Sequence, residues 1–186
     1  MSLQGAYRLG PDNGTLSVKT GRTGAAAKAG HDLLIDVTSW SATLELSDDP
    51  AQTSVSLDAD AASLHVLEGA GGMQTLGEDD KASIHQTIDE EILKGAGIEF
   101  RSTEVTAGAD GGRLRVQGEL KLAGNTHPVA FDLAIGGDGR LSASAVIKQT
   151  DWGIKPYSTL FGALKVADEV EVTLDAGPLT GARQAK

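Results

Sequence analysis

The sequence contains no cysteine, so disulfide bonds and thiolate metal sites are excluded. Positive charge is also scarce, because 16 Lys and Arg stand against 26 Asp and Glu and give a formal net charge of −10. An acidic chain of this kind repels phosphate backbones, which argues against nucleic acid as a partner. It also lacks a basic amphipathic helix that would hold it on an anionic membrane surface.

Long hydrophobic runs are missing as well. No stretch approaches the roughly 18 apolar residues that a membrane-spanning helix needs, and residues 1–10 contain no apolar core of the length found in signal peptides. We therefore expect a cytoplasmic protein without stable membrane insertion. A periplasmic or secreted location would require that a leader has been removed.

Aromatic residues make up only 4% of the chain, while Ala and Gly are abundant. The core must therefore consist mostly of Val, Leu, Ile and Ala, and small side chains lining a curved sheet leave space inside it. A chain of 186 residues is long enough for one ordinary domain. We predict a single domain over residues 1–176 and a disordered tail over residues 177–186.

Strict alternation of apolar and polar residues dominates the chain and predicts nine or ten short strands. It is clearest in residues 113–122, RLRVQGELKL, and returns in residues 129–135, 141–147 and 169–176. Gly-rich turns join these segments. Many short antiparallel strands indicate an all-β sandwich or barrel, and we expect an antiparallel barrel of about eight strands.

One segment has the period of a helix instead. Residues 79–94 place Ile84, Ile88 and Ile92 on one narrow stripe, with acidic residues in the first turn and Lys94 at the end. This pattern predicts one α-helix lying across an end of the sheet. The glycine-rich residues 68–78 before it are expected to form a flexible loop, and whether this loop acts as a flap over the interior stays open.

Signals for chemistry are weak. The glycine clusters lack the residues of a phosphate-binding loop, and no serine elbow is present. The four histidines, His31, His65, His85 and His127, lack the spacing of a metal site, although His31 and His85 could meet at the barrel mouth. We therefore predict no catalytic residue, no metal and no cofactor.

The segment TDWGIKPYSTLFG, residues 150–162, concentrates Trp152, Tyr157 and Phe161 in a chain that has few aromatic residues. Two interpretations remain open for these rings: they plug one end of a barrel as ordinary core, or they line a ligand pocket. A barrel of about eight strands is just wide enough for one ligand when its inward residues are small. Ala143 and Ala145 supply such residues.

Several motifs occur in a fixed order: GHDLLIDV, GIEFRSTEV, VQGELKLAGNTHPVAFDL, IKQTDWGI and VADEVEVTLDA. In this order the chain resembles the YceI-like family. That resemblance implies a lipocalin-like barrel that binds an elongated apolar ligand, such as a polyisoprenoid or an isoprenoid quinone. The chain departs from the family pattern in having Lys148 and Gln149 where an arginine usually stands, and Trp40 near a usual glycine.

On this basis we predict binding, storage or transport of an isoprenoid-like lipid by a protein that is not an enzyme. We expect polar residues at the mouth to surround a head group, with Lys155 as a further candidate. The predicted ligand-binding residues are Phe100, Leu114, Phe131, Ala143, Ala145, Trp152, Ile154, Tyr157, Phe161, His31, Asp32, His85 and Asp151. Two alternatives stay open: a ligand-free, dimeric interaction or stress-response module, and an enzyme using His31 and Asp151 as acid and base.

Overall fold

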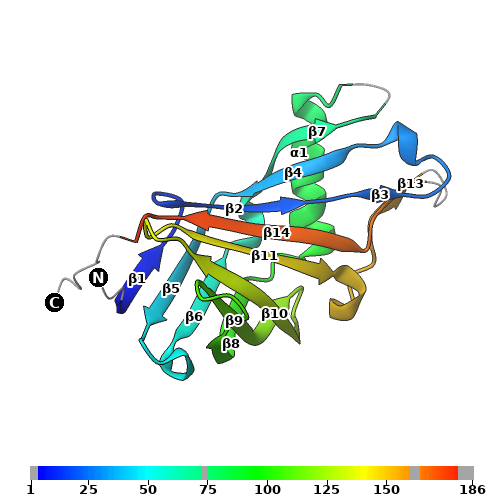
Figure 1. The fold of residues 1–186 in the computed structure, drawn as a ribbon. Helices are drawn as coiled ribbons and strands as arrows, with labels where there is room; N and C mark the ends of the chain where they lie inside the picture. The colour runs from blue at the N-terminus through cyan, green and yellow to red at the C-terminus, as the bar shows by residue number, and fades with distance from the viewer. Residues whose placement is uncertain (1–3, 73–74, 160–163, 180–186) are drawn as a thin grey trace.

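A computed structural model describes residues 4–72, 75–159 and 164–179 of the chain. Within these residues a long antiparallel sheet curls around an interior, and an α-helix lies beside it (Figure 1). The predicted all-β class with a single helix is confirmed for this part of the chain. The sheet has more strands than the predicted eight.

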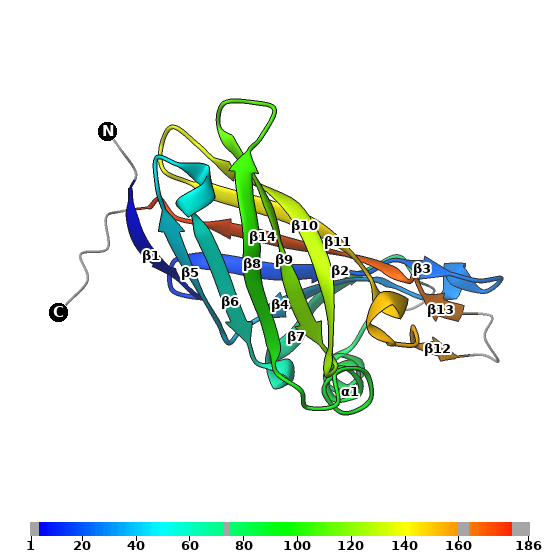
Figure 2. The same cartoon turned by 90° about the horizontal axis from the view of Figure 1, so that it is seen from below.

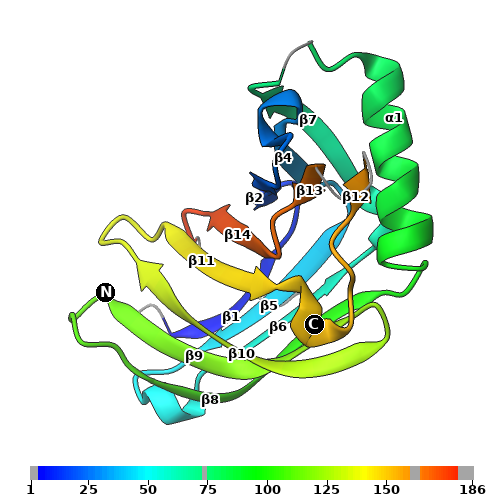
Figure 3. The ribbon, with the colours of Figure 1, turned by 90° about the vertical axis from the view of Figure 1, so that its right-hand side faces the viewer.

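Eleven strands form the curled sheet. They are β1 (Gly5–Leu9), β2 (Gly14–Lys19), β4 (Asp32–Val37), β5 (Trp40–Leu46), β6 (Ser54–Ala59), β7 (Leu64–Ala70), β8 (Ile98–Ala107), β9 (Arg113–Leu122), β10 (Asn125–Ile135), β11 (Leu141–Lys148) and β14 (Glu169–Ala176). Their spatial order is β1-β5-β6-β8-β9-β10-β11-β14-β2-β4-β7. Since β1 and β7 end this order, the sheet is a half-barrel with two edges, and Figure 3 shows its curvature.

Short elements complete the fold. A second sheet of β3 (Arg22–Thr23), β12 (Ser158–Thr159) and β13 (Leu164–Val166) lies at one end of the half-barrel (Figure 2). Single helical turns occur at η1 (Ala27–Ala29), η2 (Pro50–Gln52), η3 (Ala61–Ser63) and η5 (Gln149–Trp152). The second sheet was not expected, because strands of two or three residues are too short to show alternation.

The helix predicted over residues 79–94 is present but changes its geometry midway. α1 covers Glu78–Thr87, and the chain continues as a π-helical turn, η4, over Ile88–Ile92. The helical path ends at Lys94 and Gly95, which both have positive φ values of 55° and 66°. Figure 3 shows α1 beside the edge strand β7, so the helix covers the side of the half-barrel that the sheet leaves open.

The sheet divides between β10 and β11. β10 pairs with β9 from Asn125 to Ala134, but with β11 only from Asp132 to Ile135. Pro128 lies in the half of β10 that pairs with β9 alone. Its missing N–H therefore interrupts no hydrogen bonds between β10 and β11. The turn before β10 is Ala123–Gly124, so β10 begins at Asn125 and is longer than the strand predicted over residues 129–135.

η5 fills this division. The Trp152 side chain is 3% exposed and packs with Ile147 and Ile154. Its indole Nε1 donates to the carbonyl oxygen of Leu120 at 2.8 Å, and Asn125 Nδ2 donates to the carbonyl oxygen of Trp152 at 2.8 Å. The aromatic segment thus ties β9 and β10 to the end of β11.

Two further observations bear on the ends of the chain and on membranes. Leu179 is buried, and its N–H donates to the carbonyl oxygen of Gly139 at 2.7 Å, so packing continues into the first residues of the predicted tail. Residues 180–186 lie outside the described part.

None of the helices in the described ranges has the length and apolar character needed to cross a bilayer.

Candidate functional site: an apolar cavity inside the half-barrel

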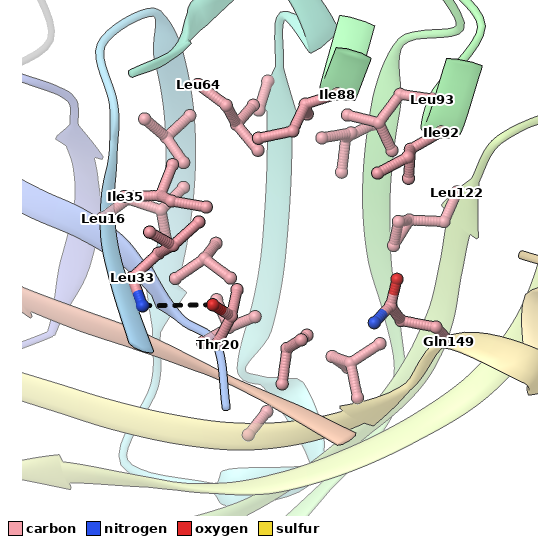
Figure 4. Close-up of a pocket in the computed structure, with 18 of the residues that line it drawn as sticks. Leu16, Thr20, Leu33, Ile35, Leu64, Ile88, Ile92, Leu93, Leu122 and Gln149 are labelled. Carbon is pink, nitrogen blue, oxygen red and sulfur yellow. Dashed lines mark hydrogen bonds between the residues drawn. The ribbon is translucent and has the colours of Figure 1, made fainter. Parts of the chain in front are cut away.

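The half-barrel encloses a cavity of about 560 Å³. Its walls are mostly aliphatic side chains that alternate along the strands, and the helical stripe contributes one side (Figure 4). Leu16 and Ile35 come from β2 and β4, while Ile88 and Ile92 come from η4. The stripe predicted for the helix therefore faces the cavity.

Packing explains why one part of the interior is hollow. Tyr7, Val105 and Val116 are at most 5% exposed and form part of a dense core. Leu57 and Val172 also point inward, yet they are only partly buried because they face the cavity. Small or aliphatic residues at such positions leave unfilled volume, whereas close packing would require larger ones.

The structure places the predicted apolar site residues in three groups. Phe100, Phe131, Ala143, Ala145, Ile154 and Tyr157 line the cavity. Leu114 packs against the dense core, and Trp152 fills the division between β10 and β11, so neither is among the described lining residues. Phe161 lies outside the described residues.

A glycine makes room for the two lining phenylalanines. The Phe100 and Phe131 ring centroids lie 5.4 Å apart. A Cβ atom on Gly118 would approach the Phe100 ring to 2.6 Å and the carbonyl oxygen of Arg101 to 2.4 Å. The alternating apolar pattern of β9 includes a glycine at this inward position because Phe100 occupies the space of a side chain.

Polar residues gather where β3 and β4 meet the end of β7. His31 lines the cavity and lies against Gly69 and Gly72, since a Cβ on Gly72 would come within 2.4 Å of His31 Nε2. Arg22 Nε lies 3.3 Å from Asp32 Oδ1, and its Nη1 donates to the carbonyl oxygen of Gly30. We call this end of the cavity the mouth.

Arg22 lines the cavity but was not predicted as a site residue. The sequence carried a signal for it, because Leu16, Val18, Thr20 and Arg22 continue one alternation and all four line the cavity. Asp32, which was predicted, pairs with Arg22 but is exposed and is not among the described lining residues.

The other predicted polar residues lie elsewhere. His85 contacts His65 and not His31: the two Nδ1 atoms are 3.1 Å apart, and the rings meet edge to face. This pair joins α1 to β7 outside the cavity lining. Asp151 and Lys155 are exposed. Among the described residues, no group of three or more histidines and acids is arranged to hold a metal ion.

Gln149 is a buried polar residue of the cavity that was not predicted as part of the site. It continues the alternation Ala143, Ala145, Ile147 by one step, and all four residues line the cavity. The residue is 8% exposed, and its Nε2 donates to the carbonyl oxygen of Ala167 at 3.0 Å. Figure 4 shows its amide directed into the cavity.

An acidic residue fixes the backbone beside Gln149. Asp168 accepts from the Thr150 N–H at 2.8 Å and from the Thr150 hydroxyl at 2.6 Å, and its carbonyl oxygen accepts from the Gln149 N–H at 2.9 Å. The pKa of the Asp168 carboxyl lies below its usual 3.8, mainly because the Thr150 hydroxyl donates to it. Some desolvation opposes this effect, while the Thr150 N–H and the positive charge of Lys148 add to it. The ionised carboxylate thus positions η5.

Comparison with known sequences places this geometry in a family context. The chain matches the YceI-like domain over residues 7–177. Among curated proteins, no match is found.

Solved structures with a similar fold include BcnA from Burkholderia cenocepacia, with a TM-score of 0.63 and 16% identity over 87% of this chain and 94% of BcnA. The YCEI protein of Campylobacter jejuni gives a TM-score of 0.51 and 16% identity over 76% of this chain and 81% of that one. A mutant of the latter, crystallised with a monobromobimane guest, gives 0.53 at 14% identity over the same shares. At such identities these likenesses show the fold.

Proposed function

Because this chain belongs to the YceI-like family, we propose that it binds an elongated apolar molecule inside its cavity and stores or carries it unchanged. A polyisoprenoid, an isoprenoid quinone or a similar lipid fits this description. The observation that carries the proposal is the cavity of about 560 Å³ with its aliphatic walls.

The size and lining of the cavity suit such a ligand. Ligand sites typically enclose about 300–1,000 Å³ and are mostly apolar, with a few polar groups that fix the orientation. Each CH₂ group moved from water into an apolar interior contributes about 0.8 kcal/mol. A medium-length chain therefore binds well through its tail alone, and half-buried side chains such as Leu57 and Val172 lose their remaining contact with water.

The placement of polar residues suggests how the ligand lies. Arg22 and His31 are at the mouth, and the Ala167 N–H donates to the carbonyl oxygen of Gly21 at 2.9 Å, which brings the segment that holds Gln149 to the same end. The opposite walls are aliphatic. We therefore place the apolar tail toward Leu44 and Ile88 and the polar end of the ligand near the mouth.

Filling the cavity tests the proposal. Ala143 and Ala145 both face inward from β11, so the double variant Ala143→Phe with Ala145→Phe adds two rings to the cavity. Val146→Phe is the matched control, because Val146 lies next to them on the same strand and is 63% exposed. Native mass spectrometry after incubation with an isoprenoid alcohol measures the bound fraction directly.

We expect the wild type and Val146→Phe to retain a stoichiometric apolar adduct that organic extraction releases. The double variant should remain folded by circular dichroism and lose the adduct. A folded double variant that still binds as well as the wild type would contradict the proposed position of the ligand, and a wild type without any adduct would contradict the function itself.

A further inference from the structure

We propose that Gln149 makes the cavity selective for neutral ligands that carry a hydrogen-bond donor, so that a long-chain alcohol binds better than its ether or its acid. This inference rests on the proposed function, because it concerns the head group of the same ligand. It assigns a specificity-determining role to a residue that neither sequence pattern nor family match singles out as a ligand contact.

The orientation of the Gln149 amide is fixed by a group that can only accept. Nε2 donates to the carbonyl oxygen of Ala167 at 3.0 Å, and a carbonyl cannot donate to Oε1 if the amide is turned around. The backbone is held at the same place, since the Gln149 N–H donates to the carbonyl oxygen of Asp168. The amide oxygen is consequently the end that is left for a ligand.

That oxygen has no protein partner in the described part of the chain. The hydrogen bonds of Gln149 in residues 4–72, 75–159 and 164–179 involve its Nε2 and its backbone, and none reaches Oε1. The residue is nonetheless more than nine-tenths buried, and Figure 4 shows its amide inside the cavity among aliphatic walls. The lining also includes Ile147, Ile154 and Val170, which belong to one apolar cluster.

An acceptor that faces the cavity and has no protein donor discriminates between ligands. When an apolar ligand displaces water from the cavity, Oε1 loses its hydrogen-bond donor unless the ligand brings one. A hydroxyl group supplies an O–H, whereas an ether of the same chain supplies only an acceptor. The ether therefore leaves two acceptors facing each other in an apolar space.

An anionic head group is disfavoured by the same geometry. A carboxylate or phosphate oxyanion has no hydrogen to give to Oε1, and its burial needs a free cation. Arg22 is already engaged by Asp32 and by the carbonyl oxygen of Gly30. Lys165 also lines the cavity but is exposed on β13, so an acid bound there is the competing outcome that the experiment must detect.

The test compares three ligands that share one chain: phytol, its methyl ether and phytanic acid. Dissociation constants are measured for the wild type, for Gln149→Leu and for Gln86→Leu. Gln86 is the matched control, because it undergoes the same change on the exposed face of α1, where its side chain donates to Glu90. Isothermal calorimetry or competition against a fluorescent probe gives the constants.

We expect the wild type to bind phytol roughly tenfold more tightly than the methyl ether, because phytol makes one more hydrogen bond to the Gln149 amide oxygen. Gln149→Leu should bring alcohol and ether to within about twofold and leave ether binding intact or stronger. Gln86→Leu should keep the wild-type ratio.

Other outcomes overturn the inference and distinguish it from the proposed function. If the wild type binds the alcohol and the ether equally well, Gln149 has no role in selectivity, while the proposed function of the cavity stands. This outcome does not depend on whether any variant folds. Tighter binding of phytanic acid assigns the head group to Lys165 instead. Binding of none of the three ligands overturns the proposed function, and this inference with it.

Discussion

The indole Nε1 of Trp152 donates to the carbonyl oxygen of Leu120 across the place where β10 leaves β11. The ring is 3% exposed and packs with Ile147 and Ile154. The aromatic segment that stands out in the sequence is therefore a structural closure for one wall of the cavity. Its contribution to stability can be measured separately from ligand binding.

Replacing Trp152 by Phe keeps an aromatic ring but removes the donor. The Leu120 carbonyl then loses this hydrogen bond in a part-buried position, and we expect the free energy of unfolding to fall by about 1–3 kcal/mol. Urea denaturation followed by circular dichroism measures the change. His127→Ala serves as the control, since His127 contacts the same indole edge to face but is exposed. A loss as small as that of the control would show that the hydrogen bond adds nothing to the closure.

A second prediction concerns the inward glycine of β9. Gly118→Ala places a Cβ within 2.6 Å of the Phe100 ring and 2.4 Å of a backbone carbonyl oxygen. Such overpacking typically costs about 1–3 kcal/mol. Gly97→Ala is the matched control, because a Cβ at Gly97 meets no atom within 4 Å. Thermal unfolding should show a lowered midpoint for Gly118→Ala alone, and equal midpoints would mean that Phe100 moves aside freely.

A third prediction concerns the lowered pKa of Asp168. A carboxyl whose pKa is lower in the folded state stabilises the protein fully above its unfolded value, near 3.8, and this stabilisation disappears as the pH falls through the folded pKa. In the wild type, unfolding midpoints recorded from neutral pH to below 3.8 should therefore decline partly through Asp168.

Asp168→Asn cannot ionise and should lack that part of the acid-induced decline. Its unfolding midpoint should be lower than that of the wild type at neutral pH, and the two should converge in acid. Asp175→Asn, an exposed acid on the neighbouring part of β14, provides the control. Parallel curves for the wild type and Asp168→Asn would contradict the role of the Thr150 hydrogen bonds.

Alternation along the strands predicted part of the cavity wall. It placed Phe100, Phe131, Ala143 and Ala145 inward, and all four line the cavity. Continued by one step of two residues past Ile147, the last apolar residue of its run, the same alternation leads to Gln149. The alternation predicted over residues 141–147 ends at an apolar residue and therefore leaves Gln149 out.

Contacts between distant segments could not be predicted in this way. The pairing of His85 with His65 depends on how α1 rotates against β7, which a helical stripe alone leaves undetermined. The division between β10 and β11 depends on where the pairing of β10 with β11 stops while its pairing with β9 continues. The sequence of each strand alone shows no interruption at that point. The aromatic residue that fills this gap was therefore assigned to a pocket on composition.

The position of β14 has a consequence for the order in which the protein folds. This strand, the last of the sheet, lies between β11 and β2, so that Val172 pairs with Ala145 on one side and with Val18 on the other. Without it, β2, β4 and β7 are not hydrogen-bonded to the remaining strands of this sheet. β2 and β4 are made early, yet they join the rest of the sheet only once β14 has been made, and contacts between such distant parts of a chain form slowly. The chain must therefore be synthesised through β14 before this half-barrel can enclose anything.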